Sequence, residues 1–231
     1  FGDKDFTKAL RNTSIYVVFV VPCSIALSLL IAVLLNSNIK FRGLFQTIFF
    51  LPYVTSVIAI GLVWSWIFNS NYGLLNYVLS WFGIAKVQWL NKPKYALPSL
   101  IIFSVWKSMA FDILIFLAGL QTIPKDLYNA ARVDSTPRWR VFWKITVPGI
   151  APMISYAFIM GFISAFKVYN EVFSLWGGKA GPANSAITVV YYIYDKFYNS
   201  HNYGLASAAA VILFLIILVL TVVQRMMGKK K

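Results

Sequence analysis

The sequence predicts an all-α membrane protein, and two observations carry this prediction. Of the 231 residues, 59% are hydrophobic and only 12% are charged, whereas a soluble domain has about 25% charged residues. Five apolar stretches reach the roughly 20 residues that a helix needs to cross a bilayer. They lie at about 14–35, 47–68, 96–120, 153–175 and 205–224. We expect one transmembrane domain over 1–231, with one more N-terminal helix preceding Phe1.

The basic residues indicate how these helices are oriented. The net charge is +14, but the lysines and arginines are spread between the apolar stretches. This distribution is typical of the flanks of membrane helices and not of a nucleic-acid interface. The short loop 36–45, the segment 124–152 and the tail after 224 are the most basic. They are therefore expected in the cytoplasm with the C-terminus, and 69–95 and 176–204 become outer loops.

The outer loops have structure of their own. In 72–83, apolar residues recur at helical spacing and aromatic residues follow, which predicts a short helix lying at the membrane interface. Residues 189–198 are rich in tyrosine and phenylalanine. We expect this stretch to cap the outer mouth of the protein or to meet another protein.

The residue inventory gives little support for an enzyme. Cys23 is the only cysteine and His201 the only histidine, which argues against a disulfide framework and a metal site. Residues 177–182 (GGKAGP) lack the spacing of a nucleotide-binding P-loop. We expect no catalytic residue, metal or cofactor in this chain.

Residues 124–152 form a polar, basic segment between two apolar stretches. Pro124 suits the start of a helix, and Ser135-Thr136-Pro137 suits a break followed by a second helix. Trp139, Phe142 and Trp143 share one face of that second helix, and Pro148 should end it. We expect a helix-break-helix that lies half against its own membrane domain and half in the groove of a partner.

This segment resembles the EAA loop, the cytoplasmic coupling loop of permease subunits in bacterial ABC importers. The family pattern is roughly E-A-A-x-x-D-G-A followed by I-x-L-P. Matching positions are Ala130, Ala131, Asp134, Ile145 and Pro148, whereas Asn129 replaces the glutamate and Ser135-Thr136 replace Gly-Ala. The resemblance implies contacts with an ATPase through Asn129, Ala130, Ala131, Asp134, Ser135, Trp139, Phe142 and Pro148.

Residues 51–53, 106–107, 117–124 and 178–182 are similar to permeases of the maltose and glycerol-phosphate type. The resemblance implies a carbohydrate importer in the bacterial cytoplasmic membrane. In it, this chain and a second, homologous permease form the path by alternating access. A solute-binding protein outside the membrane delivers a sugar, and two copies of a cytoplasmic ABC ATPase bind ATP and Mg.

Four charged residues fall inside the apolar stretches: Lys107, Asp112, Lys167 and Glu171. Each costs on the order of 3 kcal/mol in a bilayer unless it faces a partner or a polar path. Ser164, Lys167 and Glu171 would share one helix face, either as a charge pair that orients helices or as a polar wall. By position, the resemblance implies a substrate path through Lys107, Ser108, Phe111, Ser164, Lys167 and Glu171.

Three alternatives remain at this point. An ion-coupled secondary transporter would use Asp112 or Glu171 as its cation site, although no inverted repeat is evident. A membrane-embedded enzyme would need a cluster of reactive side chains. A structural membrane subunit would need no substrate path.

Overall fold

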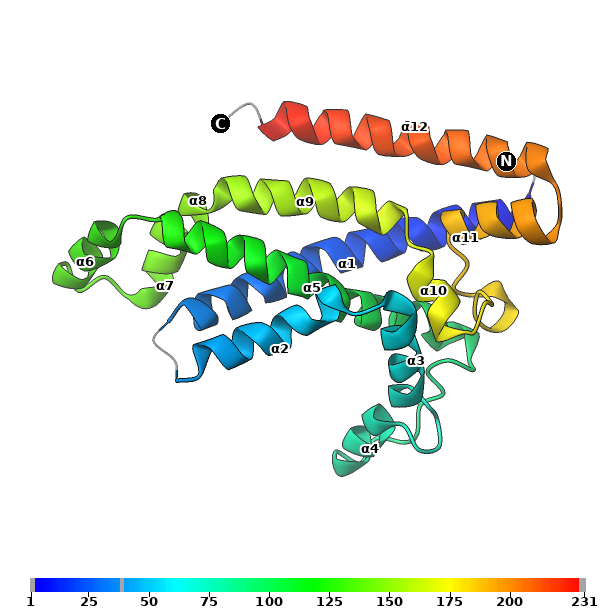
Figure 1. The fold of residues 1–231 in the computed structure, drawn as a ribbon, viewed down its shortest axis with the longest axis horizontal. Helices are drawn as coiled ribbons and strands as arrows, with labels where there is room; N and C mark the ends of the chain where they lie inside the picture. The colour runs from blue at the N-terminus through cyan, green and yellow to red at the C-terminus, as the bar shows by residue number, and fades with distance from the viewer. Residues whose placement is uncertain (1–2, 38–39, 229–231) are drawn as a thin grey trace. The chain divides into compact units, whose positions relative to one another are not determined.

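The computed structural model describes residues 3–37 and 40–228, and all of its regular elements in these ranges are helices (Figure 1). The all-α prediction is confirmed. The elements are α1 Lys4–Asn36, α2 Arg42–Val54, α3 Val57–Ile67, α4 Leu74–Trp81, α5 Pro93–Thr122, α6 Lys125–Val133, α7 Arg138–Val141, η1 Phe142–Thr146, α8 Val147–Gly149, α9 Ala151–Phe166, α10 Asn170–Leu175, η2 Pro182–Asn184, α11 Val189–Tyr194, η3 Asp195–Asn199 and α12 Tyr203–Gly228.

Three of the described helices, α1, α5 and α12, are each long and apolar enough to cross a membrane. Two interrupted pairs, α2 with α3 and the segment α7–α8 with α9, raise the number of candidate spans to five. The stretch 47–68 was expected as one helix, but it breaks at Thr55 and Ser56. Hydroxyl side chains compete for backbone hydrogen bonds and so favour helix ends over helix interiors.

The stretch 153–175 is also not one helix, because α9 ends at Phe166 and α10 begins at Asn170. The backbone at Tyr169 is non-helical, with φ −143° and ψ −54°. The buried Thr188 hydroxyl donates a 2.9 Å hydrogen bond to the Val168 carbonyl. A carbonyl freed by the helix break is therefore satisfied by a side chain from a later loop.

The residue contacts divide the chain into two compact units. The first contains the described residues of 1–21, 55–106 and 162–231, and the second contains 22–54 and 107–161. Helices α1, α5 and α9 contribute residues to both units. The expected single domain over 1–231 stays a prediction.

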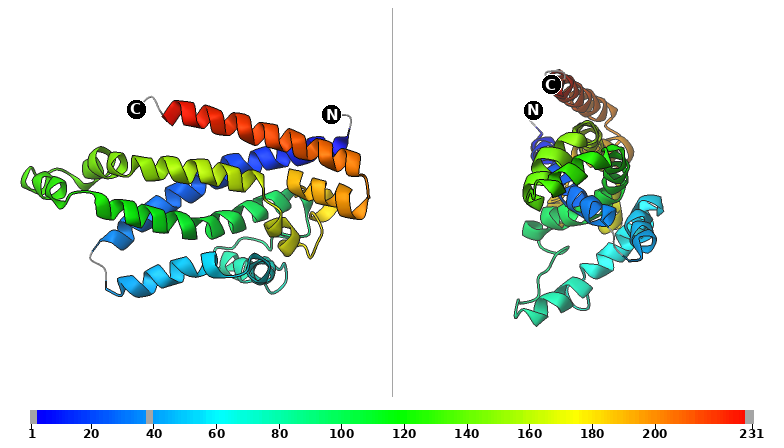
Figure 2. Two further views of the ribbon diagram at one scale, coloured as in Figure 1. Left: turned by 45° about the horizontal axis from the view of Figure 1, so that its top comes forward. Right: turned by 90° about the vertical axis from the view of Figure 1, so that its left-hand side faces the viewer.

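The second unit has an apolar core in which α5 and α9 run side by side (Figure 2). Its buried residues are Ala32, Leu35, Ile113, Phe116, Leu117, Leu120, Ile123, Ile150 and Ala157. Gly119 allows the close approach of the two helices, because a Cβ there would lie 2.9 Å from Met153 Cγ. The core thus fixes the two helices that flank the polar segment 124–152.

In the first unit, α3 packs closely against α10. A Cβ added to Gly61 would overlap the Ser174 side chain, so only glycine fits at this crossing. The Trp64 ring contacts Phe68, Phe103 and Trp106, with centroids 5.1, 5.7 and 5.3 Å away. These contacts pack α3 against the first part of α5.

The loop 69–95, which is expected outside the membrane, contains α4, and this confirms the short helix expected in 72–83. Asn76 holds this loop in place and is 5% exposed. Its amide nitrogen donates to the carbonyls of Ser70 and Val87, at 3.1 and 2.9 Å. Its oxygen accepts from the Val87 amide and from Trp89 Nε1, at 3.2 and 3.0 Å.

The loop 176–204, which is also expected outside the membrane, is hydrogen-bonded to the start of α1. Asn12 Nδ2 donates to the carbonyls of Ser185 and Ile187, both at 3.0 Å. The Thr13 hydroxyl accepts a 3.0 Å hydrogen bond from the Val189 amide. Polar side chains near the start of an apolar helix therefore replace backbone partners that the irregular loop lacks.

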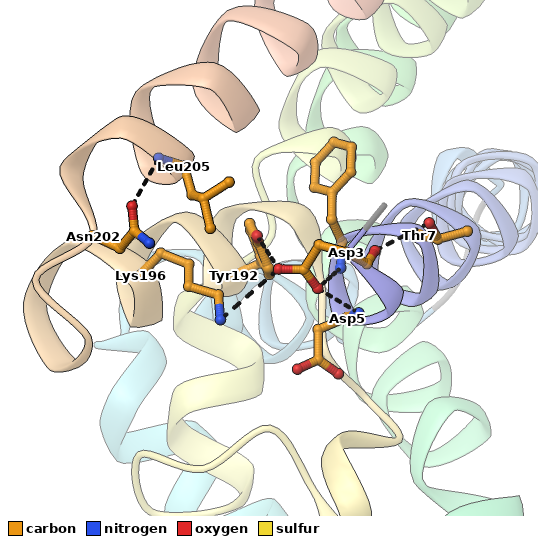
Figure 3. Close-up of polar contacts among 8 residues, drawn as sticks. Asp3, Asp5, Thr7, Tyr192, Lys196, Asn202 and Leu205 are labelled. Carbon is orange, nitrogen blue, oxygen red and sulfur yellow. Dashed lines mark hydrogen bonds and ion pairs between the residues drawn. The ribbon is translucent and has the colours of Figure 1, made fainter. Parts of the chain in front are cut away.

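One more link joins these segments through Asp3 (Figure 3). The Tyr192 hydroxyl donates a 2.8 Å hydrogen bond to the Asp3 carboxylate, and Lys196 Nζ lies 4.0 Å from the same oxygen. The hydrogen bond from Tyr192, together with the Asp5 and Phe6 amides and the Lys196 charge, lowers the pKa of Asp3 despite partial burial. Burial and this bond raise the pKa of Tyr192.

Candidate functional site

The helix-break-helix expected in 124–152 is confirmed. Its first arm is α6, and its second arm runs through α7, η1 and α8. The first arm ends in a Schellman motif. The Thr136 amide donates to the Ala131 carbonyl at 2.9 Å, and the Ser135 amide donates to the Arg132 carbonyl at 3.0 Å. This motif places Ser135 in the left-handed region, with φ +52°.

The second arm does not end at Pro148, as its sequence suggested. Pro148 lies inside α8, and the chain turns by 67° from this arm into α9. Proline has no N–H to donate to the carbonyl four residues earlier. The five residues before Val147 form the wider π-turn η1, a local adjustment that such a missing bond permits.

The two arms are joined by buried contacts. The hydroxyls of Tyr128 and Thr146 lie 3.2 Å apart and share a hydrogen bond. Thr146 is 5% exposed and Ala131 is 8% exposed. These contacts pack the two arms against each other.

Large apolar side chains nevertheless remain exposed on this segment. Val133 is 86% exposed, Trp139 70%, Trp143 54% and Leu127 49%. The rings of Trp139 and Trp143 contact each other edge to face, with centroids 6.3 Å apart. Exposed aromatic and aliphatic anchors surrounded by polar residues are typical of a surface that a partner protein covers.

The residues expected to contact the ATPase are mostly accessible. Exposed side chains are those of Asn129, Ala130, Asp134, Ser135, Trp139 and Pro148, whereas Phe142 is half-buried and Ala131 is buried. Ala131 and Phe142 thus support the segment from inside. The other positions remain candidates for direct contact.

The residues expected to line the substrate path fall in both units. Lys107, Ser108 and Phe111 are half-buried on the part of α5 that belongs to the second unit. The Phe111 ring stacks on Tyr53, with centroids 5.3 Å apart and ring planes 22° apart. The sequence did not indicate Tyr53 as a candidate, since its ring reaches Phe111 only through the tertiary fold.

In the first unit, Ser164 lies on α9, Lys167 in the break after it, and Glu171 on α10. The expected shared helical face of these three residues is wrong, because the helix ends before Lys167. Ser164 and Lys167 are exposed and Glu171 is half-buried. Their roles in a substrate path stay predictions.

Asp112 is buried in the second unit, with 7% of its surface exposed. Ser24 lies close enough to its carboxyl group to hydrogen-bond to it. The buried Asp112 carboxyl therefore has a polar neighbour within the same unit.

Comparison with known proteins agrees with this geometry. Residues 24–231 match the family described as "Binding-protein-dependent transport system inner membrane component". The arabinooligosaccharides transport system permease protein AraP of Halalkalibacterium halodurans is 36% identical, over 95% of this chain and 70% of its own. The trehalose/maltose transport system permease protein MalF of Thermococcus litoralis is 36% identical, over 88% of this chain and 68% of its own length. The lactose transport system permease protein LacF of Rhizobium radiobacter is 33% identical, over 97% and 76%.

Solved structures are similar over the whole chain. A chain of a bacterial alginate ABC transporter, crystallised with an alginate pentasaccharide-bound periplasmic protein, matches with a TM-score of 0.89. It is 25% identical, and the match covers 100% of this chain and 80% of that one. The ion-coupled, enzymatic and purely structural alternatives are not supported. The chain belongs to the family of inner-membrane permease components of binding-protein-dependent transport systems.

Proposed function

We propose that this chain forms half of the translocation path of an ABC importer for an oligosaccharide. The relatives are named for arabinooligosaccharides, trehalose and maltose, and lactose, which supports a substrate of two or more sugar units. A solute-binding protein outside the membrane delivers the sugar, and a second homologous permease completes the path. The C-terminus and segment 124–152 face the cytoplasm.

The exposed apolar anchors on segment 124–152 carry the coupling part of this proposal. Two copies of a separate ATPase bind ATP and Mg, and one of them covers Val133, Trp139 and Trp143. When the ATPase dimer closes, the joined arms move as one body and transmit the motion to α5 and α9. These helices carry Lys107, Ser108, Phe111 and Ser164, so the motion changes the side of the membrane from which the sugar path is open. Lys167 and Glu171 come directly after α9 in the sequence and move with its end.

Uptake in Trp139→Glu would test this coupling. The variant places a charge in the apolar contact, so binding-protein-stimulated ATP hydrolysis and sugar uptake should both fall by about tenfold or more. Trp81→Glu is a matched control, because Trp81 is also 70% exposed but lies on α4 in the outer loop. It should leave stimulated ATP hydrolysis close to the parent value.

The assay would use the full transporter in proteoliposomes, with the amount of each subunit measured beside the rates. Equal uptake by the parent and Trp139→Glu would contradict the coupling role. A loss in both variants would indicate a general defect and would also count against it.

A further inference from the structure

A hollow of about 930 Å³ lies in the second unit, where four helices meet. Asn36 and Arg42 line it from α1 and α2, Gln121 from the end of α5, and Lys125, Asn129 and Arg132 from α6. We infer that this hollow binds the phosphate group of an anionic phospholipid. The inference does not depend on the proposed substrate or on coupling to an ATPase.

The charge of the hollow supports an anionic ligand. Its lining includes the cations Arg42, Lys125 and Arg132, and none of the described lining residues is acidic. The C-terminal ends of α1 and α5 oppose these charges with about half a negative charge each. Three positive charges against roughly one negative charge leave the hollow strongly positive.

The donors also suit a phosphate. Arginine presents a planar fork of N–H groups that can bind two phosphate oxygens at once. Asn36 Oδ1 lies 3.5 Å from Arg42 Nη2 and steadies that guanidinium group. Asn129 and Gln121 add neutral amide donors at the wall. The site thus offers both charge and directed hydrogen bonds.

The place of the hollow in the fold points to a lipid and not to a free anion. Asn36 and Thr122 end two helices that are long and apolar enough to cross a membrane, so the hollow lies at the depth of lipid headgroups. Next to Arg42, α2 exposes Leu44 and Ile48, at 59% and 54%. These side chains can contact the acyl chains of a lipid whose phosphate occupies the hollow. Basic pockets at helix ends bind anionic lipid headgroups in this way.

A bound lipid leaves the exposed apolar anchors of segment 124–152 free, and Asn129 is the one expected ATPase-contact residue that lines the hollow. Lys125, Asn129 and Arg132 lie on one face of α6, at i, i+4 and i+7. The exposed Leu127 and Val133 lie outside the hollow's lining. The lipid would therefore contact the face of α6 that lines the hollow and brace α6 against the ends of α1 and α5.

Native mass spectrometry of the purified transporter, titrated with phosphatidylglycerol in a mild detergent, would test the inference. Each cation near an anionic lipid changes its affinity by about fivefold, so Arg42→Gln with Arg132→Gln should weaken binding by about thirtyfold. Arg42→Lys keeps the charge and should bind within about threefold of the parent. Lys40→Gln is the matched control, since Lys40 is exposed, lies two residues from Arg42 and does not line the hollow.

Three outcomes would overturn the inference. Equal phosphatidylglycerol affinity in the parent and the double variant would place the lipid elsewhere. Equal retention of zwitterionic phosphatidylcholine would remove the role of the charge. If millimolar inorganic phosphate displaced the lipid, and phosphate bound tightly to the parent but not to the double variant, the hollow would be a site for a free anion. If each variant elutes at the same volume as the parent in size-exclusion chromatography, a loss of lipid binding is not caused by a loss of folding.

Discussion

The conformation of Ser135 gives a prediction that can be worked out in magnitude. Ser135 has φ +52° at the end of α6, and an L-residue in the left-handed region costs about 1–2 kcal/mol. Glycine adopts this conformation without that cost but loses more chain entropy on folding, about 0.5–1 kcal/mol. Ser135→Gly should therefore stabilise the break by about 0.5–1 kcal/mol. The exposed serine side chain has no hydrogen bond in the described contacts that the change would remove.

Hydrogen exchange over 124–152 would measure this effect locally. The Thr136 amide, bonded to the Ala131 carbonyl at 2.9 Å, should exchange about two to fivefold more slowly in Ser135→Gly. Ser135→Ala is the control, because alanine lacks the hydroxyl and keeps the cost of positive φ. Faster exchange in the glycine variant, or equal slowing in the alanine variant, would refute the conformational argument.

The crossing of α3 and α10 and the Asp3 link give two further predictions. Gly61→Ala should lower the free energy of unfolding by about 1–3 kcal/mol through overlap with Ser174. In the same thermal assay, Gly43→Ala should be neutral or stabilising, because a Cβ there meets nothing within 4 Å. For Asp3, whose pKa is lowered from 3.8, the stabilisation is present above that pH and is lost as pH falls through the lowered pKa. The difference in thermal midpoint between parent and Asp3→Asn should therefore shrink from neutral pH to below pH 3.8; a constant difference would argue against the Tyr192 and Lys196 contacts.

The sequence by itself determined the class of the protein and the helix-break-helix form of segment 124–152. A long hydrophobic stretch predicts a membrane helix, because a bilayer offers no water to the backbone groups and a helix bonds them within the segment. This rule needs no tertiary contact. The break at Ser135-Thr136-Pro137 was also readable, since proline acts within a few residues. The expected hydroxyl cap with proline at the first helical position was wrong, because Pro137 itself is the N-cap residue of α7 and no side chain caps that helix. Helical spacing placed Trp139, Phe142 and Trp143 on one face, but only the structure showed that the two tryptophans are exposed and Phe142 is half-buried.

Only the tertiary structure decided where the long apolar stretches break and which distant residues meet. The break after Phe166 is stabilised by Thr188, a residue about twenty positions later, so no local pattern could predict it. The stacking of Tyr53 on Phe111 and the cationic hollow likewise join residues from separate helices. Local rules fix short-range hydrogen bonds and spacing, whereas side-chain partners that lie far apart in the sequence are chosen by the packing of the whole chain.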